Sequence, residues 1–424
     1  MRARAYITAD AREQTAWGTA RSYVAVGIAT TDVGNALTPS ITGFNRAFIQ
    51  WAGITAGITT SFYDFFVWTA IGYRTYFPNS DSGDQGWWVW AYTAQLGASI
   101  SAEQRRMTQI VGTVGGTTFV SGGNPANASL VVGTSTTGAG YGGMQSPDIV
   151  GNIRLDQTWG SAQIMAAAHE VNASYYGSIS NGLSETGHPG DKWGWVAGAG
   201  LRLNFPFIAQ GDYFQTQATY TQGAVRYMMQ NNNQPNFGWE RGGDFGFGVT
   251  SDCVFASTST TVGIPPGPIN ATGCNLTTGW QVNASYEHYW TPQFHESFFG
   301  GITELRYNSQ ANAILCVAEG AGTGTLALAN PGCNNNFDIW TAGTRLQYDF
   351  TKSLYFGVEF LYSHLDSASL PGNVLFPPNT TALLPANNDM ACANGTTTGF
   401  APCAHIKDMN NLAVTARIHK DFLP

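Results

Sequence analysis

Apolar and polar residues alternate with a period of two along most of this chain. Arg2 to Asp10 places Arg, Tyr, Thr and Asp side chains on one face and Ala and Ile on the other, and Trp17 to Ala29 repeats the pattern. Such alternation is typical of a β-strand with one wet and one apolar face. In Leu354 to His364 every second residue is apolar as far as Tyr362. We expect that strand to present a continuous apolar face.

The alternating pattern predicts about 15 strands over the whole chain. Their connections switch regularly between tight turns and long segments, one of which is expected at Thr30 to Ile41. The predicted strands are Arg2–Asp10, Trp17–Ala29, Thr42–Trp51, Ile54–Tyr63, Trp87–Leu96, Ala98–Met107, Asp148–Gln157, Trp159–Ala173, Trp193–Leu203, Tyr213–Tyr227, Gly279–Trp290, His295–Tyr307, Asp338–Asp349, Leu354–His364 and Asn410–Phe422.

Short turns at one end and long loops at the other are typical of an outer-membrane barrel, whereas a soluble sandwich has no reason to separate them. Tryptophans also fall near the predicted strand ends, where an interfacial girdle would place them. They are Trp17, Trp51, Trp87, Trp88, Trp159, Trp193, Trp290 and Trp340. The pattern therefore predicts an all-β fold, a transmembrane antiparallel β-barrel of the porin type that forms a single domain over residues 1–424.

The stretch Asp64–Gly86 does not alternate, although predicted strands flank it on both sides. It is too long and too aromatic for a hairpin turn. We expect it to fold into the lumen and to constrict the pore, with its aromatic residues on the wall and its charged residues in water. The aromatic residues are Phe65, Phe66, Trp68 and Tyr76, and the charged ones are Asp64, Arg74, Asp81 and Asp84. An ordinary surface loop is the alternative.

Four arginines lie on the polar faces of strands near the two ends of the chain, namely Arg4, Arg21, Arg46 and Arg417. Closure of a barrel would bring these strands together and place the arginines opposite the acidic loop. Opposite charges across a narrow pore create a transverse field that orients dipolar solutes. The alternative is that these arginines only solvate the lumen wall.

Composition supports a membrane setting without helical spans. Only 11% of the 424 residues are charged, whereas about 25% is usual for a soluble domain. The apolar runs fall short of the ~18 residues that a helical span needs. The net charge of −8 offers no basic surface for phosphates, so no nucleic acid is expected as a partner.

The six cysteines fall as three close pairs, each within one loop-like stretch: Cys253 with Cys274, Cys316 with Cys333, and Cys392 with Cys403. Pairing within a loop is the simplest connectivity, and an even set indicates an oxidising compartment. We therefore expect three local disulfides on the external side. Metal binding is the alternative, but the spacing shows no CxxC or HxxxH motif.

Several stretches resemble the general porins of alphaproteobacterial outer membranes, of the rhizobial and Brucella type. They are the opening Arg2-Ala3-Arg4-Ala5, the run Asp10 to Arg21, the constriction-loop region and the closing Arg417 to Pro424. The resemblance covers essentially the whole chain. It implies a homotrimer of barrels with about 16 strands each, whose third external loop folds into the pore.

An even strand number would leave one strand, and a secretion signal, missing before Met1. We therefore expect the first and last strands not to pair along their length.

The function predicted from these observations is that of an outer-membrane general diffusion porin, a water-filled channel for ions and small hydrophilic solutes surrounded by lipid and lipopolysaccharide. A substrate-specific channel, for instance for sugars, a plugged structural barrel and a barrel enzyme are the alternatives. No catalytic residue, cofactor or metal is predicted, because GxSxG, HExxH and P-loop motifs are missing. His169-Glu170 and His295-Glu296 are adjacent on strands, so they point to opposite faces and cannot form a dyad.

Overall fold

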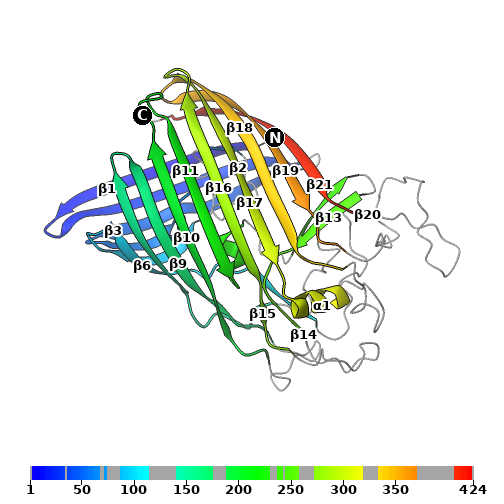
Figure 1. The fold of residues 1–424 in the computed structure, drawn as a ribbon. Helices are drawn as coiled ribbons and strands as arrows, with labels where there is room; N and C mark the ends of the chain where they lie inside the picture. The colour runs from blue at the N-terminus through cyan, green and yellow to red at the C-terminus, as the bar shows by residue number, and fades with distance from the viewer. Residues whose placement is uncertain are drawn as a thin grey trace.

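One large antiparallel sheet contains fifteen strands (Figure 1). The strands lie side by side in the order in which they occur along the chain, and each is hydrogen-bonded to its neighbours. The computed structural model describes residues 2–33, 36–66, 71–73, 86–113, 140–174, 188–229, 236–241, 244–256, 272–318, 333–369 and 405–422. None of the helices in this part of the chain is long and apolar enough to cross a membrane.

Each strand of the large sheet overlaps one of the ranges expected from alternation. The strands are β1 (Arg2–Thr15), β2 (Gly18–Val33), β3 (Ala36–Trp51), β4 (Ile54–Thr59), β5 (Trp87–Thr93), β6 (Ala98–Glu103), β8 (Asp148–Gln157), β9 (Gly160–Val171), β10 (Lys192–Asn204), β11 (Tyr213–Gln222), β16 (Thr278–Tyr289), β17 (Phe294–Arg306), β18 (Phe337–Thr351), β19 (Leu354–Asp366) and β21 (Met409–Lys420).

The expected long loop at Thr30 to Ile41 is wrong. β2 continues to Val33 and β3 begins at Ala36, with paired backbone from Thr30↔Pro39 to Val33↔Ala36. Pro39 suggests a loop by sequence because it has no N–H to donate. Pairing between the two strands overrides that local signal, since β-propensity depends on context.

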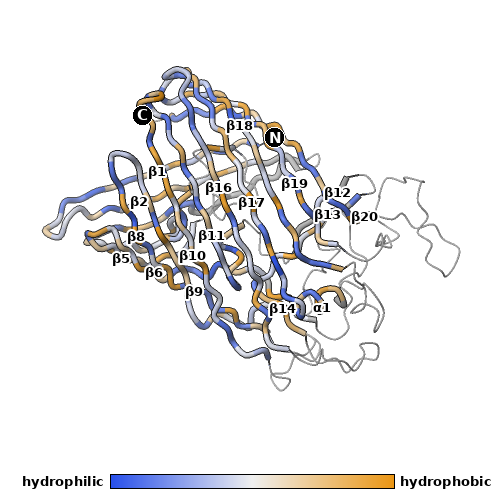
Figure 2. Tube along the Cα trace, viewed as in Figure 1, coloured by the Kyte–Doolittle hydropathy of each residue, from blue (hydrophilic) through white to orange (hydrophobic). Residues whose placement is uncertain are grey.

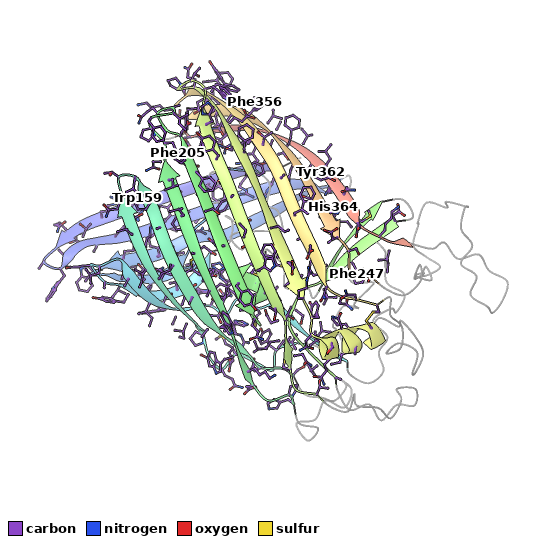
Figure 3. The ribbon with its side chains drawn as sticks, in the orientation of Figure 1. Trp159, Phe205, Phe247, Phe356, Tyr362 and His364 are labelled. Atoms are coloured by element: carbon purple, nitrogen blue, oxygen red, sulfur yellow. A yellow bond between two sulfur atoms is a disulfide. The ribbon has the colours of Figure 1, made fainter. Side chains whose placement is uncertain are left out.

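Alternation along the strands separates an inner face from an outer face. On β11 the inward Gln217, Thr219 and Thr221 are buried, whereas the outward Tyr220 is exposed. On β19 the outward Phe356, Phe360 and Tyr362 are exposed, which confirms the predicted apolar face. Phe356 and Tyr362 are labelled in Figure 3. Figure 2 shows the resulting change between hydrophilic and hydrophobic residues along the strands. The sheet thus has a polar inside and an apolar outside, as a membrane barrel requires.

Exposed tryptophans mark the end of the sheet with the tight turns. Trp17, Trp51, Trp159 and Trp290 all lie in or beside such turns, and each is more than 40% exposed. Indole rings at one level of a barrel are typical of the boundary between lipid and water. The four tryptophans at this end therefore agree with the aromatic girdle that the sequence predicts.

Smaller elements lie at the other end, within the long connections (Figure 1). They are β7 (Gln109–Thr113), β14 (Ser251–Ala256) and β15 (Asn275–Leu276) in one small sheet, β12 (Asn236–Arg241), β13 (Asp244–Val249) and β20 (His405–Ile406) in another, the 3-10 helix η4 (Val225–Tyr227) and the helix α1 (Ser309–Ala318). The pairs β7–β14 and β13–β20 are parallel and join segments far apart in the chain. We call these elements the external cover.

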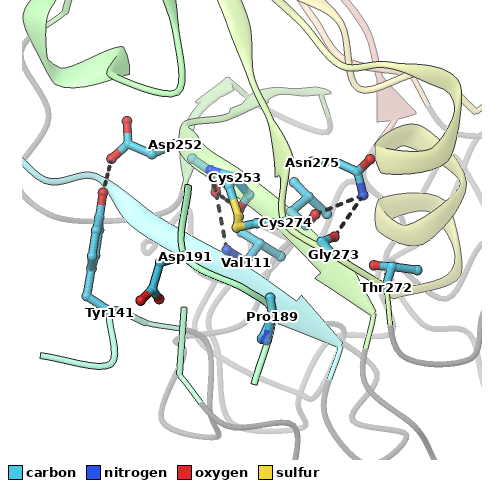
Figure 4. The surroundings of a disulfide bond; sticks show 12 residues. Val111, Tyr141, Pro189, Asp191, Asp252, Cys253, Thr272, Gly273, Cys274 and Asn275 are labelled. Atoms are coloured by element: carbon cyan, nitrogen blue, oxygen red, sulfur yellow. Dashed lines mark hydrogen bonds between the residues drawn. A yellow bond between two sulfur atoms is a disulfide. The ribbon is translucent and has the colours of Figure 1, made fainter. Parts of the chain in front are cut away.

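Two of the expected disulfides are confirmed, both in the external cover. They join Cys253 to Cys274 and Cys316 to Cys333. Figure 4 shows the first of them beside Val111 of β7. The third expected pair, Cys392 with Cys403, lies outside the described residues.

β1 and β21 are the two end strands of the sheet, and no pairing joins them within the described residues. This agrees with the expectation that the first and last strands do not pair along their length.

Candidate functional site

Between β4 and β5, residues 61–66 and 71–73 lie inside the large sheet and contact its inner wall on two sides. We call these residues the internal segment. Near its start, the Phe62 N–H donates to Glu103 Oε1 on β6 at 2.9 Å, and the Tyr63 hydroxyl donates to Thr219 on β11 at 3.3 Å. The segment therefore begins against β6 to β11.

Farther along, the internal segment reaches the opposite group of strands. The Tyr73 hydroxyl donates to Gln347 Oε1 on β18 at 2.9 Å, and its N–H donates to Glu359 on β19. The Tyr73 carbonyl accepts from Arg417 on β21 at 3.4 Å, and the Arg417 guanidinium lies 4.5 Å from the Tyr73 ring centre. The segment thus connects the walls formed by β6–β11 and β18–β21.

One glutamine of the wall holds two consecutive backbone groups of the segment. Gln217 Oε1 on β11 accepts from the N–H of Phe65 at 3.0 Å and from that of Phe66 at 2.9 Å. Without Gln217 these two buried N–H groups would have no acceptor, because neither a turn nor a sheet hydrogen bond provides one there.

Apolar packing completes the attachment. Tyr63 and Phe65 pack in a cluster with Val150, Met165 and Val196 of β8, β9 and β10. In a second cluster, Phe66 and Ile71 of the segment pack against Phe299, Leu361 and Ala413 of β17, β19 and β21 on the other wall. Burial of such a side chain contributes roughly 1.5–3 kcal/mol.

Glycines in the wall leave room for the rings of the segment. A Cβ added at Gly198 would lie 2.7 Å from the Tyr63 hydroxyl oxygen, and one at Gly200 would overlap the Phe65 ring. On the opposite wall, a Cβ at Gly357 would overlap the Tyr73 hydroxyl. The inward glycines of β10 and β19 therefore make the wall complementary to the segment.

Asp64 lies at the base of the segment and pairs with Arg106. The two side chains are 4% and 0% exposed, and the guanidinium also lies 4.5 Å and 4.6 Å from the ring centres of Trp87 and Tyr227. The sequence pattern predicts that Asp64 lies in water, whereas the structure buries its side chain. A carboxylate inside packed surroundings requires an opposite charge, and Arg106 supplies it.

The predicted arginines occupy different surroundings on the inner face. Arg21 pairs with Asp10 at 3.0 Å and also donates to Gln50, while Arg46 donates to the carbonyl of Asn45 at 2.7 Å. The Arg4 guanidinium lies 5.4 Å from the Tyr6 ring centre. Of the four, Arg417 is the one that the structure brings to the described internal segment. Arg74, Asp81 and Asp84 lie outside the described residues.

A buried charged cluster that was not predicted from the sequence lies on the inner wall of β16, β17 and β18. Arg345 donates to Glu287 at 3.0 Å, and Glu287 also accepts from His295 and Ser297. His295 lies 3.4 Å from Asp349 on its other side. The alternation signal that places Arg21 inside also places these residues inside, so the same argument could have found them.

A cavity of about 290 Å³ lies beneath the internal segment, at the end with the tight turns. Phe65 of the segment forms part of its wall. The other lining residues come from β8 to β11 and are Arg154, Asp156, Gln157, Gly160, Ser161, Arg202, Asn204 and Gln215. Two arginines and several neutral polar groups thus surround one opening.

At the opposite end a buried polar network joins the wall of the large sheet to the external cover. His169 on β9 contacts Asp148 at 2.8 Å and the Tyr141 hydroxyl at 2.7 Å. That hydroxyl donates to Asp252 of β14 at 2.8 Å, as Figure 4 shows. Burial and the neighbouring Asp252 raise the pKa of Tyr141, so the hydroxyl stays protonated and able to donate. The network therefore fixes the cover on the wall.

One group of the described residues could hold a metal ion. His364, Asp366 and Asp408 offer ligand atoms within 4.8 Å of one another, on the outer side of β19 and beside β21. This group is remote from the internal segment.

Comparison with known proteins agrees with the fold. The family model described as the Porin subfamily matches residues 1–390. The crystal structure of the outer membrane channel DcaP of Acinetobacter baumannii has a TM-score of 0.50 at 12% identity, covering 97% of this chain and 84% of that one. OmpT, an outer membrane protein of Vibrio cholerae, has a TM-score of 0.35 at 7% identity, covering 87% and 90%. A search of curated protein sequences finds no match.

Proposed function

We propose, from the premise that this chain belongs to the porin subfamily, that it is a general diffusion porin. The protein is an outer-membrane channel, and its β-strands cross the bacterial outer membrane. Ions and small hydrophilic solutes would pass through a water-filled lumen, lined by the polar inner face of the sheet. Membership of the porin subfamily indicates a channel rather than an enzyme.

The internal segment is the observation that carries the proposal. It is attached to strands on both walls through Gln217, Gln347 and Glu359. A chain held across a lumen narrows it without filling it, and that is how a diffusion pore sets its size limit. The constricting loop would extend over Asp64–Gly86, with Asp64 as its anchor and Arg74, Asp81 and Asp84 as its charged residues.

The basic side of the constriction would be formed by Arg4, Arg21, Arg46 and Arg417. Contact between Arg417 and the Tyr73 carbonyl supports this for one of them. The barrel would have about 16 strands and would assemble as a homotrimer in contact with lipopolysaccharide, as in the alphaproteobacterial porins that the sequence resembles.

Conductance of the purified protein in planar lipid bilayers tests the proposal. We expect stepwise, ohmic channels whose current is reduced by neutral polymers small enough to enter the lumen. A reconstituted, folded protein that gives no conductance would contradict it and favour a plugged structural barrel.

A further inference from the structure

We infer that the cavity beneath the internal segment is a binding subsite for solutes that carry carboxylate groups, with Arg202 as its main anion-binding group. The inference rests on the proposed function, because a subsite in the lumen serves passage only if the lumen conducts.

Arg202 on β10 is positioned as an unneutralised cation. Its guanidinium stacks over the Tyr213 ring, 3.9 Å from the ring centre. No Asp or Glu of the described residues lies within ion-pair distance of it. Stacking uses the face of the guanidinium and leaves its in-plane N–H groups for a ligand, and this fork matches the geometry of a carboxylate.

Arg154 on β8 provides a second cation in the same cavity. It pairs with Asp156 at 2.9 Å, and both side chains are largely exposed at 42% and 63%. An exposed pair of this kind is weak, so Arg154 can exchange its partner for an incoming anion. Two arginines against one aspartate leave the cavity with a net positive charge, although the whole chain carries −8.

The rest of the cavity suits a small polar molecule. Its volume of about 290 Å³ lies near the lower end of small-molecule pockets, which span roughly 300–1,000 Å³. Phe65 supplies an apolar wall, and Ser161, Asn204 and Gln215 supply neutral polar groups. A short dicarboxylate has this combination of charged ends and an apolar middle.

The position of the cavity makes it a stage of the permeation path. It lies between the internal segment and the end with the tight turns, which is the periplasmic end in an outer-membrane barrel. Binding in a channel must be strong enough to favour entry and weak enough to permit release. A partly open site whose Arg202 has no carboxylate partner among the described residues meets both conditions.

The experiment compares succinate with succinamide, its uncharged analogue of similar size, on single channels in planar bilayers. Succinate should interrupt the current of the wild-type channel, and succinamide should do so much less. In Arg202→Gln we expect the succinate binding constant to fall about tenfold, the change expected for the loss of one charge-assisted contact. Arg12→Gln is the matched control, because Arg12 is an inward arginine of β1 that pairs with Asp10 away from the cavity. It should leave succinate binding unchanged.

Calorimetric titration of succinate into the detergent-solubilised protein provides a second readout that does not need conductance. A protein that binds succinate through Arg202 but does not conduct would overturn the proposed function and keep the subsite. A protein that conducts normally, yet binds succinate no better than succinamide or equally well in Arg202→Gln, would overturn the subsite and keep the proposed function.

Discussion

At the scale of single residues, the internal segment depends on a few polar side chains in the wall. Gln217 is the clearest case, since one carbonyl oxygen serves two successive N–H groups. It is buried at 3% exposure, so water cannot readily replace it. Leu at this position would fill a similar volume and leave both donors without a partner.

We therefore expect Gln217→Leu to destabilise the seating of the segment by about 1–3 kcal/mol for each unpaired donor. Current noise should rise and the size limit for neutral polymers should increase, while the barrel remains folded. Gln222→Leu, at an exposed position of the same strand, is the control. Identical noise and size limits in the two variants would show that the Gln217 contacts do not hold the segment.

Asp212, in the turn between β10 and β11, is a second residue whose contribution to stability can be measured. Its carboxylate accepts from the Tyr286 hydroxyl at 2.7 Å, the Tyr289 N–H at 2.8 Å and His288 at 2.7 Å. Burial by itself would raise the pKa of Asp212, but these hydrogen bonds outweigh burial and lower it. The stabilisation is therefore present above the unfolded pKa of about 3.9 and is lost as the pH falls through the lower folded pKa.

Urea unfolding in lipid vesicles checks this prediction. At pH 7 we expect Asp212→Asn to be less stable than the wild type, and the difference should shrink as the pH falls below about 4. Asp191→Asn, at an exposed carboxylate, should behave as the wild type throughout. A difference between wild type and Asp212→Asn that is constant with pH would contradict the assigned hydrogen bonds.

At the scale of elements, the two faces of a strand tolerate different residues. Phe360 lies in the middle of β19 and points outward, and the neighbouring Thr415 of β21 points inward beside Glu359. Charge on a lipid-facing position near the bilayer midplane costs roughly 2–4 kcal/mol, whereas a lumen position is wet.

We expect Phe360→Lys to lose about 2–4 kcal/mol of unfolding free energy in vesicles, and Thr415→Lys to lose less than about 1 kcal/mol. Urea titration followed by tryptophan fluorescence measures both. Equal losses would mean that the faces of β19 and β21 are not divided between lipid and lumen.

At the scale of the whole molecule, the distribution of charge decides ion preference. Arg21 and Arg46 lie on the inner faces of β2 and β3, with Arg21 paired to Asp10 and Arg46 held near Asn45. Removal of both would take positive potential from the lumen, where screening is weaker than in bulk water.

The double variant Arg21→Gln/Arg46→Gln should therefore shift the reversal potential in a salt gradient toward cation preference. The barrel should remain stable, because both positions face the lumen. An unchanged reversal potential at normal conductance would place these arginines away from the constriction and favour a role in solvating the wall.

The sequence by itself determined the course of the large sheet's strands apart from the β2–β3 hairpin end, the faces of those strands and the class of protein. Period-two alternation is a local property, so it survives in Leu354 to Tyr362 whatever the rest of the chain does. The pairing of Cys253 with Cys274 and of Cys316 with Cys333 was predictable for the same reason, since the partners lie close along the chain. The segment after β4 could also be recognised from the sequence, because apolar and polar residues do not alternate in it.

Only the tertiary structure decided which residues these strands and segments contact. Asp64 faces Arg106, and Phe65 fits against Gly200, because curvature of the large sheet brings together residues that no local pattern connects. The parallel pairs of the external cover and the cavity at Arg202 depend on segments tens to hundreds of residues apart. Alternation tells which way a side chain points, but a partner across the lumen is set by how the large sheet curves, and that curvature has no signature in the sequence around either residue.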